Sequence, residues 1–94
     1  MKITVGTTSG KLSEFLDTAG VLEKVQEIWT EKIITFEVQT SSAIVYFEYG
    51  DTATTSTGFP LEEWAGTLNI ALENLYDYAV IGSGADIDVR LLVM

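Results

Sequence analysis

The sequence predicts an all-β fold, a compact antiparallel β-sandwich or small barrel, formed by residues 1–94 as a single domain. A chain of 94 residues is long enough for one domain. Hydrophobic residues make up 47% and charged residues 20% of the chain, which is typical of a folded globular protein. About five or six short alternating segments, separated by turn residues roughly every 8–12 positions, indicate the strands of a sandwich or barrel. We also expect one short helix or an extended arm within residues 1–30.

The N-terminal third combines a strand pattern with helix signals. Lys2–Val5 alternates as a strand does, and the Gly-, Ser- and Thr-rich segment Gly6–Gly10 predicts a turn. Leu12–Leu16 predicts a single helical turn or a tight loop. The apolar residues of Val21–Trp29 recur with the spacing of one face of an amphipathic helix, although this segment also fits a strand. The sequence leaves open whether residues 1–30 fold with the sandwich or extend from it.

The middle of the chain has the period-two alternation of β-strands. In Ile33–Gln39 every second residue is apolar, and Thr40–Ser42 predicts a turn. Ala43–Tyr49 is apolar at successive positions, so we expect a strand with both faces covered. Gly50–Gly58 predicts a polar loop, and Phe59–Gly66 predicts a second turn region anchored by aromatic residues.

The last third predicts three further strands. Leu68–Leu72 alternates, Leu75–Ile81 reads as a strand, and Gly82–Ala85 is a tight connection to a final strand over Asp86–Met94. Connections this short require antiparallel neighbours, because a parallel pair needs a long crossover. The residues of Leu91–Met94 are all apolar. This segment is therefore expected to be a central strand or to be covered by another chain.

The charge balance excludes several function classes. The chain carries 14 acidic residues against 5 basic ones, a formal net charge of −9. Such a field repels phosphate backbones, so we expect no nucleic-acid partner. The sequence has no histidine and no cysteine, and thus lacks the commonest general base and any thiol nucleophile. We expect a protein that is not an enzyme, has no cofactor and, without an apolar run of about 20 residues, does not span a membrane.

Carboxylate pairs are the remaining candidates for chemistry. Asp86 and Asp88, together with Asp51, could coordinate Ca²⁺ through oxygen ligands. However, two aspartates two residues apart on a strand point to the same solvated face, and no calcium-loop spacing follows. Glu62–Glu63 could act as an acid and base pair, but nothing in the sequence raises the pKa of either carboxyl. We therefore expect neither a metal site nor a catalytic residue.

Aromatic and terminal apolar residues are the candidate interface anchors. Aromatic side chains supply large contact areas at protein interfaces. The interface candidates are Tyr46, Tyr49, Phe59, Trp64, Tyr76, Leu92 and Met94. Arg90, the only arginine, is expected to pair with Asp88 or Asp77 or, alternatively, with a carboxylate of another chain.

The strand and turn residues of the chain from about residue 33 to residue 94 resemble a known protein family. The matching segments are Ile44–Gly50, Thr55–Leu61, Leu68–Leu72 and Leu75–Arg90. Their pattern is similar to that of small β-sandwich virion proteins of tailed bacteriophages, of the capsid decoration (cement) or head–tail accessory type. The resemblance implies a structural protein of the capsid exterior, made in the host cytoplasm. Its implied partners are the major capsid protein or other virion subunits, and it implies a dimer, a trimer or a lattice-bound chain.

One function of a different class also fits the sequence. A non-catalytic β-sandwich that binds carbohydrate or another small ligand would use Trp64 and the tyrosines as stacking platforms. An acidic mimic of DNA is disfavoured, because the carboxylates are scattered along the chain. The sequence favours the virion role over both.

Overall fold

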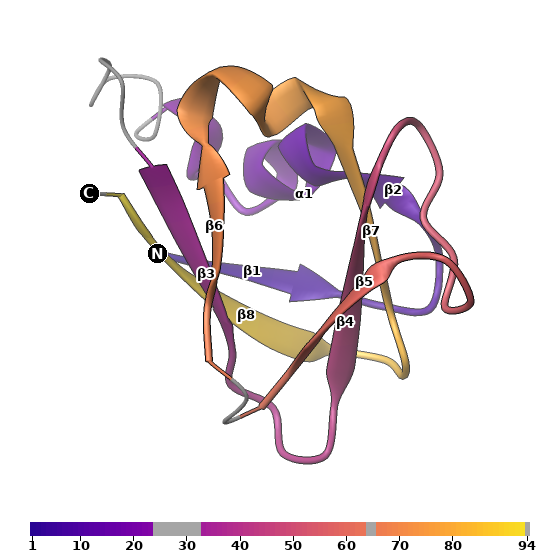
Figure 1. Cartoon of the computed structure of the whole chain (residues 1–94). Coiled ribbons are helices and arrows are strands. Elements are labelled where there is room, and N and C mark those ends of the chain that lie inside the picture. Colours follow the sequence, from indigo (N-terminus) through magenta and orange to yellow (C-terminus); the bar gives the residue numbers. More distant parts are fainter. Residues whose placement is uncertain (24–32, 64–65, 94) are drawn as a thin grey trace.

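The strands of the computed structural model, which describes residues 1–23, 33–63 and 66–93, form two four-stranded sheets (Figure 1). Every pairing between neighbouring strands is antiparallel. Sheet A has the strand order β1 (Lys2–Val5), β8 (Ile87–Val93), β3 (Ile33–Val38), β6 (Leu68–Ala71). Sheet B has the order β2 (Gly10–Lys11), β7 (Tyr78–Gly82), β4 (Ile44–Tyr49), β5 (Phe59–Glu62). The fold is therefore an antiparallel β-sandwich, as predicted.

The core lies between the two sheets and is made of the alternate residues of their strands. Phe36 of β3 and Phe47 of β4 meet across the sandwich, with ring centroids 5.4 Å apart and the ring planes tilted by 53°. In β3 the buried and more exposed residues alternate strictly, because one face of the strand packs on sheet B. The side chains that are less than 2% exposed include Ile3, Ile34, Phe36, Val45, Ile87 and Leu91.

The described part of the N-terminal third is built into the sandwich. β1 pairs with β8, and the helix α1 (Leu12–Thr18) follows β2 directly. The sequence predicts a single turn or tight loop at this place; the helix is longer because Leu12 and Leu16, four residues apart, are both fully buried. Of the predicted helix Val21–Trp29, only the first three residues lie within the described part of the chain. β2 has two residues, too few to produce a pattern in the sequence.

The prediction of a turn over Phe59–Gly66 is wrong for its first half. Phe59–Glu62 forms β5, which pairs with β4 through Leu61 opposite Val45 and Pro60 opposite Tyr46. Pro60 argues against a central strand, because proline has no backbone N–H to donate. β5 is the edge strand of sheet B, and proline is tolerated there.

The predicted strand Leu75–Ile81 begins three residues too early. Residues Leu72–Asp77 form a 3-10 helix, η1, and β7 starts at Tyr78. Leu75 is 1% exposed and enters the core from this helix. The strand expected over Leu68–Leu72 correspondingly ends at Ala71. Figure 1 shows η1 and α1 together across one end of the sandwich.

The two most apolar strands differ from each other in exposure. β4 is buried on its inner face at Val45 and Phe47, but its outer face is only half-buried and Tyr49 is exposed. The expectation that both of its faces are covered is therefore wrong. β8 lies between β1 and β3, so the strand that contains Leu92 is central in its sheet. β1 pairs with β8 over Ile87–Arg90, whereas Leu92 and Val93 pair with β3 alone. β8 is therefore central over its first four residues, and the alternative of a covering chain concerns the exposed Leu92.

Candidate interaction surfaces

Tyr49 and Tyr78 form an aromatic pair where β4 ends and β7 begins. The two residues are cross-strand partners, and their rings meet edge to face with centroids 5.7 Å apart and an interplanar angle of 88°. Tyr78 is half-buried and packs against the core, whereas Tyr49 is 71% exposed. The contact with the half-buried Tyr78 therefore restrains the exposed ring of Tyr49, which lowers the conformational entropy that binding would otherwise cost.

Phe59 extends this aromatic surface to the sheet edge. It lies opposite Phe47 in the β4–β5 pairing, and Tyr49 follows Phe47 by two residues. Phe59 and Tyr49 therefore share one face of sheet B as diagonal neighbours, at roughly 7–8 Å. Phe59 is 58% exposed. We call Tyr49, Phe59 and Tyr78 the aromatic end of the molecule.

The polar loop between β4 and β5 is fastened next to the aromatic end. One carboxylate oxygen of Glu48 accepts hydrogen bonds from the backbone N–H of Thr54 at 3.2 Å and from the hydroxyl of Thr57 at 2.7 Å. The backbone N–H of Ala53 donates to the hydroxyl of Ser9 at 2.8 Å. These hydrogen bonds hold the loop in place, because its small polar side chains bury little apolar surface.

Lys11 ties the same loop to β2 and to η1. Its Nζ lies 2.8 Å from Oδ1 of Asp51 and donates to the backbone carbonyl of Tyr76 at 3.0 Å. The hydrogen bond and the charge of Lys11 lower the pKa of the Asp51 carboxyl below its usual range. The side chain of Tyr76 is half-exposed, and this residue of η1 precedes Tyr78 of the aromatic end by two positions.

The outer face of sheet A, which points away from sheet B, carries a row of charges across three strands. Arg90 of β8 lies opposite Lys2 of β1 on one side and opposite Glu37 of β3 on the other. Lys2 forms an ion pair with Asp88 at 3.7 Å. The expected pairing of Arg90 with Asp88 or Asp77 is wrong, because Asp88 pairs with Lys2 and no ion pair of Arg90 is found within the described residues.

Two large apolar side chains lie beside this charged row. Leu92 is 52% exposed and Ile33 is 45% exposed. Leu92 is the cross-strand partner of Thr35, and Ile33 precedes Thr35 by two residues on the same face of β3. Sequence reasoning identified Leu92 but missed Ile33, Lys2 and Glu37. Their juxtaposition depends on strand register, which the alternation pattern does not reveal.

The other interface candidates are less prominent. Tyr46 lies on the outer face of sheet B between Pro60 and Ile81 and is half-buried. Gly58 approaches it so closely that an added Cβ would lie 2.8 Å from the Cβ of Tyr46. Trp64 and Met94 lie outside the described residues.

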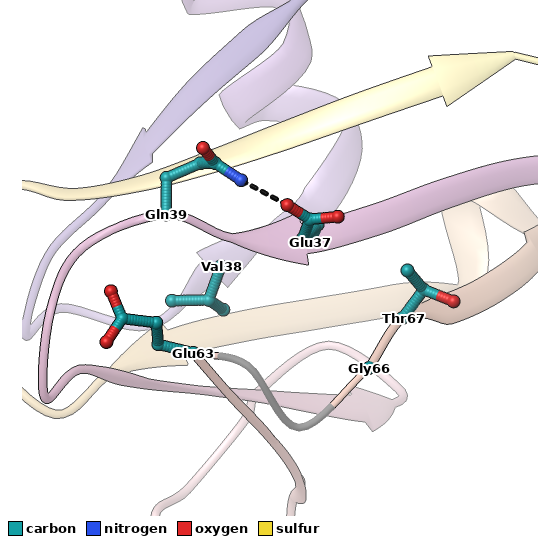
Figure 2. A pocket seen from close by; sticks show the side chains of 6 residues that line it. All are labelled: Glu37, Val38, Gln39, Glu63, Gly66 and Thr67. Atoms are coloured by element: carbon teal, nitrogen blue, oxygen red, sulfur yellow. Dashed lines mark hydrogen bonds between the residues drawn. The ribbon is translucent and has the colours of Figure 1, made fainter.

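A pocket of about 270 Å³ opens beside the end of β3 (Figure 2). Figure 2 shows that its lining comes from β3 and from the segment between β5 and β6. The lining residues are Glu37, Val38, Gln39, Glu63, Gly66 and Thr67. The Nε2 of Gln39 donates a hydrogen bond to Glu37, so one of the two carboxylates is already engaged. Two acidic side chains, Glu37 and Glu63, line the pocket together with the apolar side chain of Val38.

The three aspartates considered for calcium do not form a site within the described residues. Asp51 is bound to Lys11 on sheet B, and Asp88 is bound to Lys2 on sheet A. No group of three acidic side chains within metal-binding reach occurs in residues 1–23, 33–63 and 66–93. The helices in the same part of the chain include none long and apolar enough to cross a membrane.

Comparison with family models, curated proteins and solved structures found no match to this chain.

Proposed function

We propose that this chain is a structural virion protein of a tailed bacteriophage, a capsid decoration (cement) protein that binds the outside of the assembled shell where subunits meet. The proposal is supported by the resemblance of residues 33–94 to such proteins and by the β-sandwich fold. The observation that carries it is the aromatic end, where two large aromatic side chains stand more than half exposed on ordered strands. Exposed aromatic residues in a preorganised frame are typical anchors of protein interfaces.

Binding at the aromatic end explains how so small a protein could reinforce a shell. Tyr49 and Phe59 would fill shell pockets, and the loop fastened by Glu48 and Lys11 would surround them. A protein that binds only the assembled lattice stabilises that lattice by RT ln(1 + [L]/Kd) per site. The net charge of −9 keeps the free chain soluble before it binds.

A head–tail or tail accessory protein is the alternative within the same class. It would use the same anchors at a few symmetric positions rather than over the whole lattice. The two versions differ in copy number and not in the residues that bind.

A carbohydrate-binding module is the second candidate from a different class. It is favoured by the exposed ring of Tyr49, since sugar rings stack on such platforms. In that case Tyr49→Ala would abolish the binding of an oligosaccharide, and the protein would not add to shells.

Cosedimentation with preformed shells tests the proposal. The probe is the empty shell assembled from the major capsid protein of the phage that encodes the chain. The parent is expected to bind saturably, and the double variant Tyr49→Ala, Phe59→Ala to bind at least about 30-fold more weakly, as for loss of a hot spot of about 2 kcal/mol or more. Both side chains are exposed, so the variant is expected to keep the fold.

Glu62→Ala is the control, because it shortens an exposed side chain of the same strand as Phe59 but on the opposite face of sheet B. It is expected to bind within about fivefold of the parent, since truncation outside a hot spot costs less than about 1 kcal/mol. A parent chain that fails to sediment with shells would overturn the proposal. Equal binding by the parent and the double variant would remove the aromatic end from it.

A further inference from the structure

The outer face of sheet A is electrically neutral in a strongly acidic chain. Its described charged residues are Lys2 and Arg90, which are basic, and Glu37 and Asp88, which are acidic. Among the described residues of this face these two positive and two negative charges cancel, whereas the whole chain carries a formal charge of −9. Two of the five basic residues of the sequence gather on this one face. A second copy that approaches this face therefore meets described charges that sum to zero.

The guanidinium of Arg90 forms no ion pair with the other described charges on this face. Lys2 and Arg90 are direct cross-strand neighbours, an unfavourable placement for like charges. The ion pair of Lys2 with Asp88 at 3.7 Å relieves it. Within the described residues, Arg90 has no ion pair of its own, although its guanidinium offers five donors in a fork that fits a carboxylate.

We propose that two copies of this chain associate through the outer faces of their A sheets, with Arg90 of each copy paired to Glu37 of the other. Arg90 and Glu37 lie on the neighbouring strands β8 and β3. A two-fold axis that runs parallel to these strands and between them brings each Arg90 opposite the other copy's Glu37. The same axis brings each Leu92 opposite the other copy's Thr35. This is the reciprocal contact that a symmetric dimer requires.

The apolar residues supply the burial for this contact. Leu92 and Ile33, both about half exposed, lie diagonally across β8 and β3 next to the charged row. Face-to-face sheets pack about 10 Å apart with interdigitated side chains, which would cover both residues. A partner with a basic surface would be repelled by Lys2 and Arg90 on this face. Such a partner would bind better to the acidic surface elsewhere on the chain. A second copy is therefore the occupant that fits both the charge pattern and the apolar residues.

The size of the face limits the area that the two copies can bury. Four strands about 4.8 Å apart, with about five residues of about 3.4 Å each, give a face of roughly 300 Å² in each copy. An interface of this size lies at the lower end of specific protein contacts, below about 1,200 Å² in total accessible surface. We therefore expect a weak, reversible dimer. This inference does not rest on the virion role.

Sedimentation velocity over a concentration series tests the dimer with charge variants of the whole chain. Arg90→Glu places two acidic pairs across the axis, and Glu37→Arg places two basic pairs there. Each variant alone is expected to weaken the dimer at least about tenfold. An equimolar mixture of the two is expected to restore it as a heterodimer. In that heterodimer the glutamate introduced at position 90 faces the arginine introduced at position 37, and the unchanged Glu37 of one variant faces the unchanged Arg90 of the other. Circular dichroism verifies that both variants are folded.

Glu62→Arg is the matched control, since it makes the same charge change as Glu37→Arg on the exposed edge strand of sheet B. It is expected to leave the dimer constant within about twofold or to strengthen it slightly by lowering the net charge. A parent that remains monomeric at millimolar concentration would overturn the inference, as would a mixture that fails to form the heterodimer. The double variant Tyr49→Ala, Phe59→Ala should still dimerise, which separates this inference from the proposed shell binding.

Discussion

The ammonium of Lys11 and the carboxylate of Asp51 lie 2.8 Å apart and join β2 to the loop that follows β4. Lys11 also donates to the backbone carbonyl of Tyr76, so one side chain connects three segments that are distant in the sequence. The backbone N–H of Gly50 also donates a hydrogen bond to the carbonyl of Asp77 at 2.7 Å, which joins the same loop to the end of η1. The ion pair is therefore a local fastening for the loop beside the aromatic end.

The substitution Asp51→Asn is expected to make stability less dependent on pH. Lys11 lowers the pKa of Asp51 in the folded protein, so the ionised carboxylate stabilises the fold above the unfolded pKa of about 3.9. That contribution is lost as the pH falls through the lowered pKa. The parent should be more resistant to urea than the variant at about pH 7, and the difference should vanish in strong acid. Urea midpoints measured at several pH values test this.

The control for this experiment is Glu62→Gln, which removes an exposed carboxylate from the edge of sheet B. It makes the same change of charge away from Lys11 and so measures the effect of the net charge alone. A pH-independent difference between the parent and Asp51→Asn would show that the effect arises from the amide and not from the lost charge.

Leu16→Ala is expected to destabilise the whole domain. Leu16 is fully buried and lies in the same hydrophobic cluster as residues of both sheets. Truncating such a side chain typically costs about 2–5 kcal/mol. A single cooperative urea transition with a lower midpoint is the expected result, compared with a change within about 0.5 kcal/mol for the exposed neighbour in Asp17→Ala. An unchanged midpoint for Leu16→Ala would mean that α1 is not part of the cooperative unit.

Gly82→Ala is expected to destabilise the connection between β7 and β8. An added Cβ would lie 2.7 Å from Cδ1 of Ile87 and 3.0 Å from the carbonyl oxygen of Gly6. Ile87 can move, but the carbonyl of Gly6 is held by a 2.8 Å hydrogen bond from the N–H of Gly82 itself. Overpacking of this kind costs about 1–3 kcal/mol.

Gly84→Ala, two residues further along the same turn, provides the comparison. Nothing lies within 4 Å of its added Cβ, so no loss of stability is expected. Thermal unfolding of the two variants under identical conditions decides the matter. Equal melting temperatures would contradict the close packing at Gly82.

The fold could be predicted from the sequence wherever one strand face is buried and the other faces water. Ile33–Val38 is such a strand, and its alternation identifies both its structure and its core residues. The errors have two local causes. The segment Phe59–Gly66 was expected to be a turn region, yet Phe59–Glu62 forms an edge strand, where Pro60 is tolerated. The strand over Leu75–Ile81 was expected to begin at Leu75, although this residue reaches the core from a 3-10 helix.

The candidate surfaces were less predictable than the fold. Residue type suggested Tyr49 and Phe59 as anchors, but exposure separates them from the half-buried Tyr46. The row formed by Lys2, Arg90 and Glu37 arises from the register of three strands that are far apart in the sequence. Alternation specifies which face a residue occupies and not which residue lies opposite it. For that reason Arg90 was paired with the wrong carboxylates.

The copy number of the chain in purified particles tests the central claim most directly. If the chain is the virion protein proposed above, quantitative mass spectrometry of purified particles of its source virus would detect it and would measure its amount relative to the major shell protein. A lattice-wide decoration protein predicts between about one chain per shell subunit and about one per three, as the symmetry of shell sites requires. About a dozen copies per particle would instead indicate the neck or tail. Absence of the chain from particles would contradict the virion role.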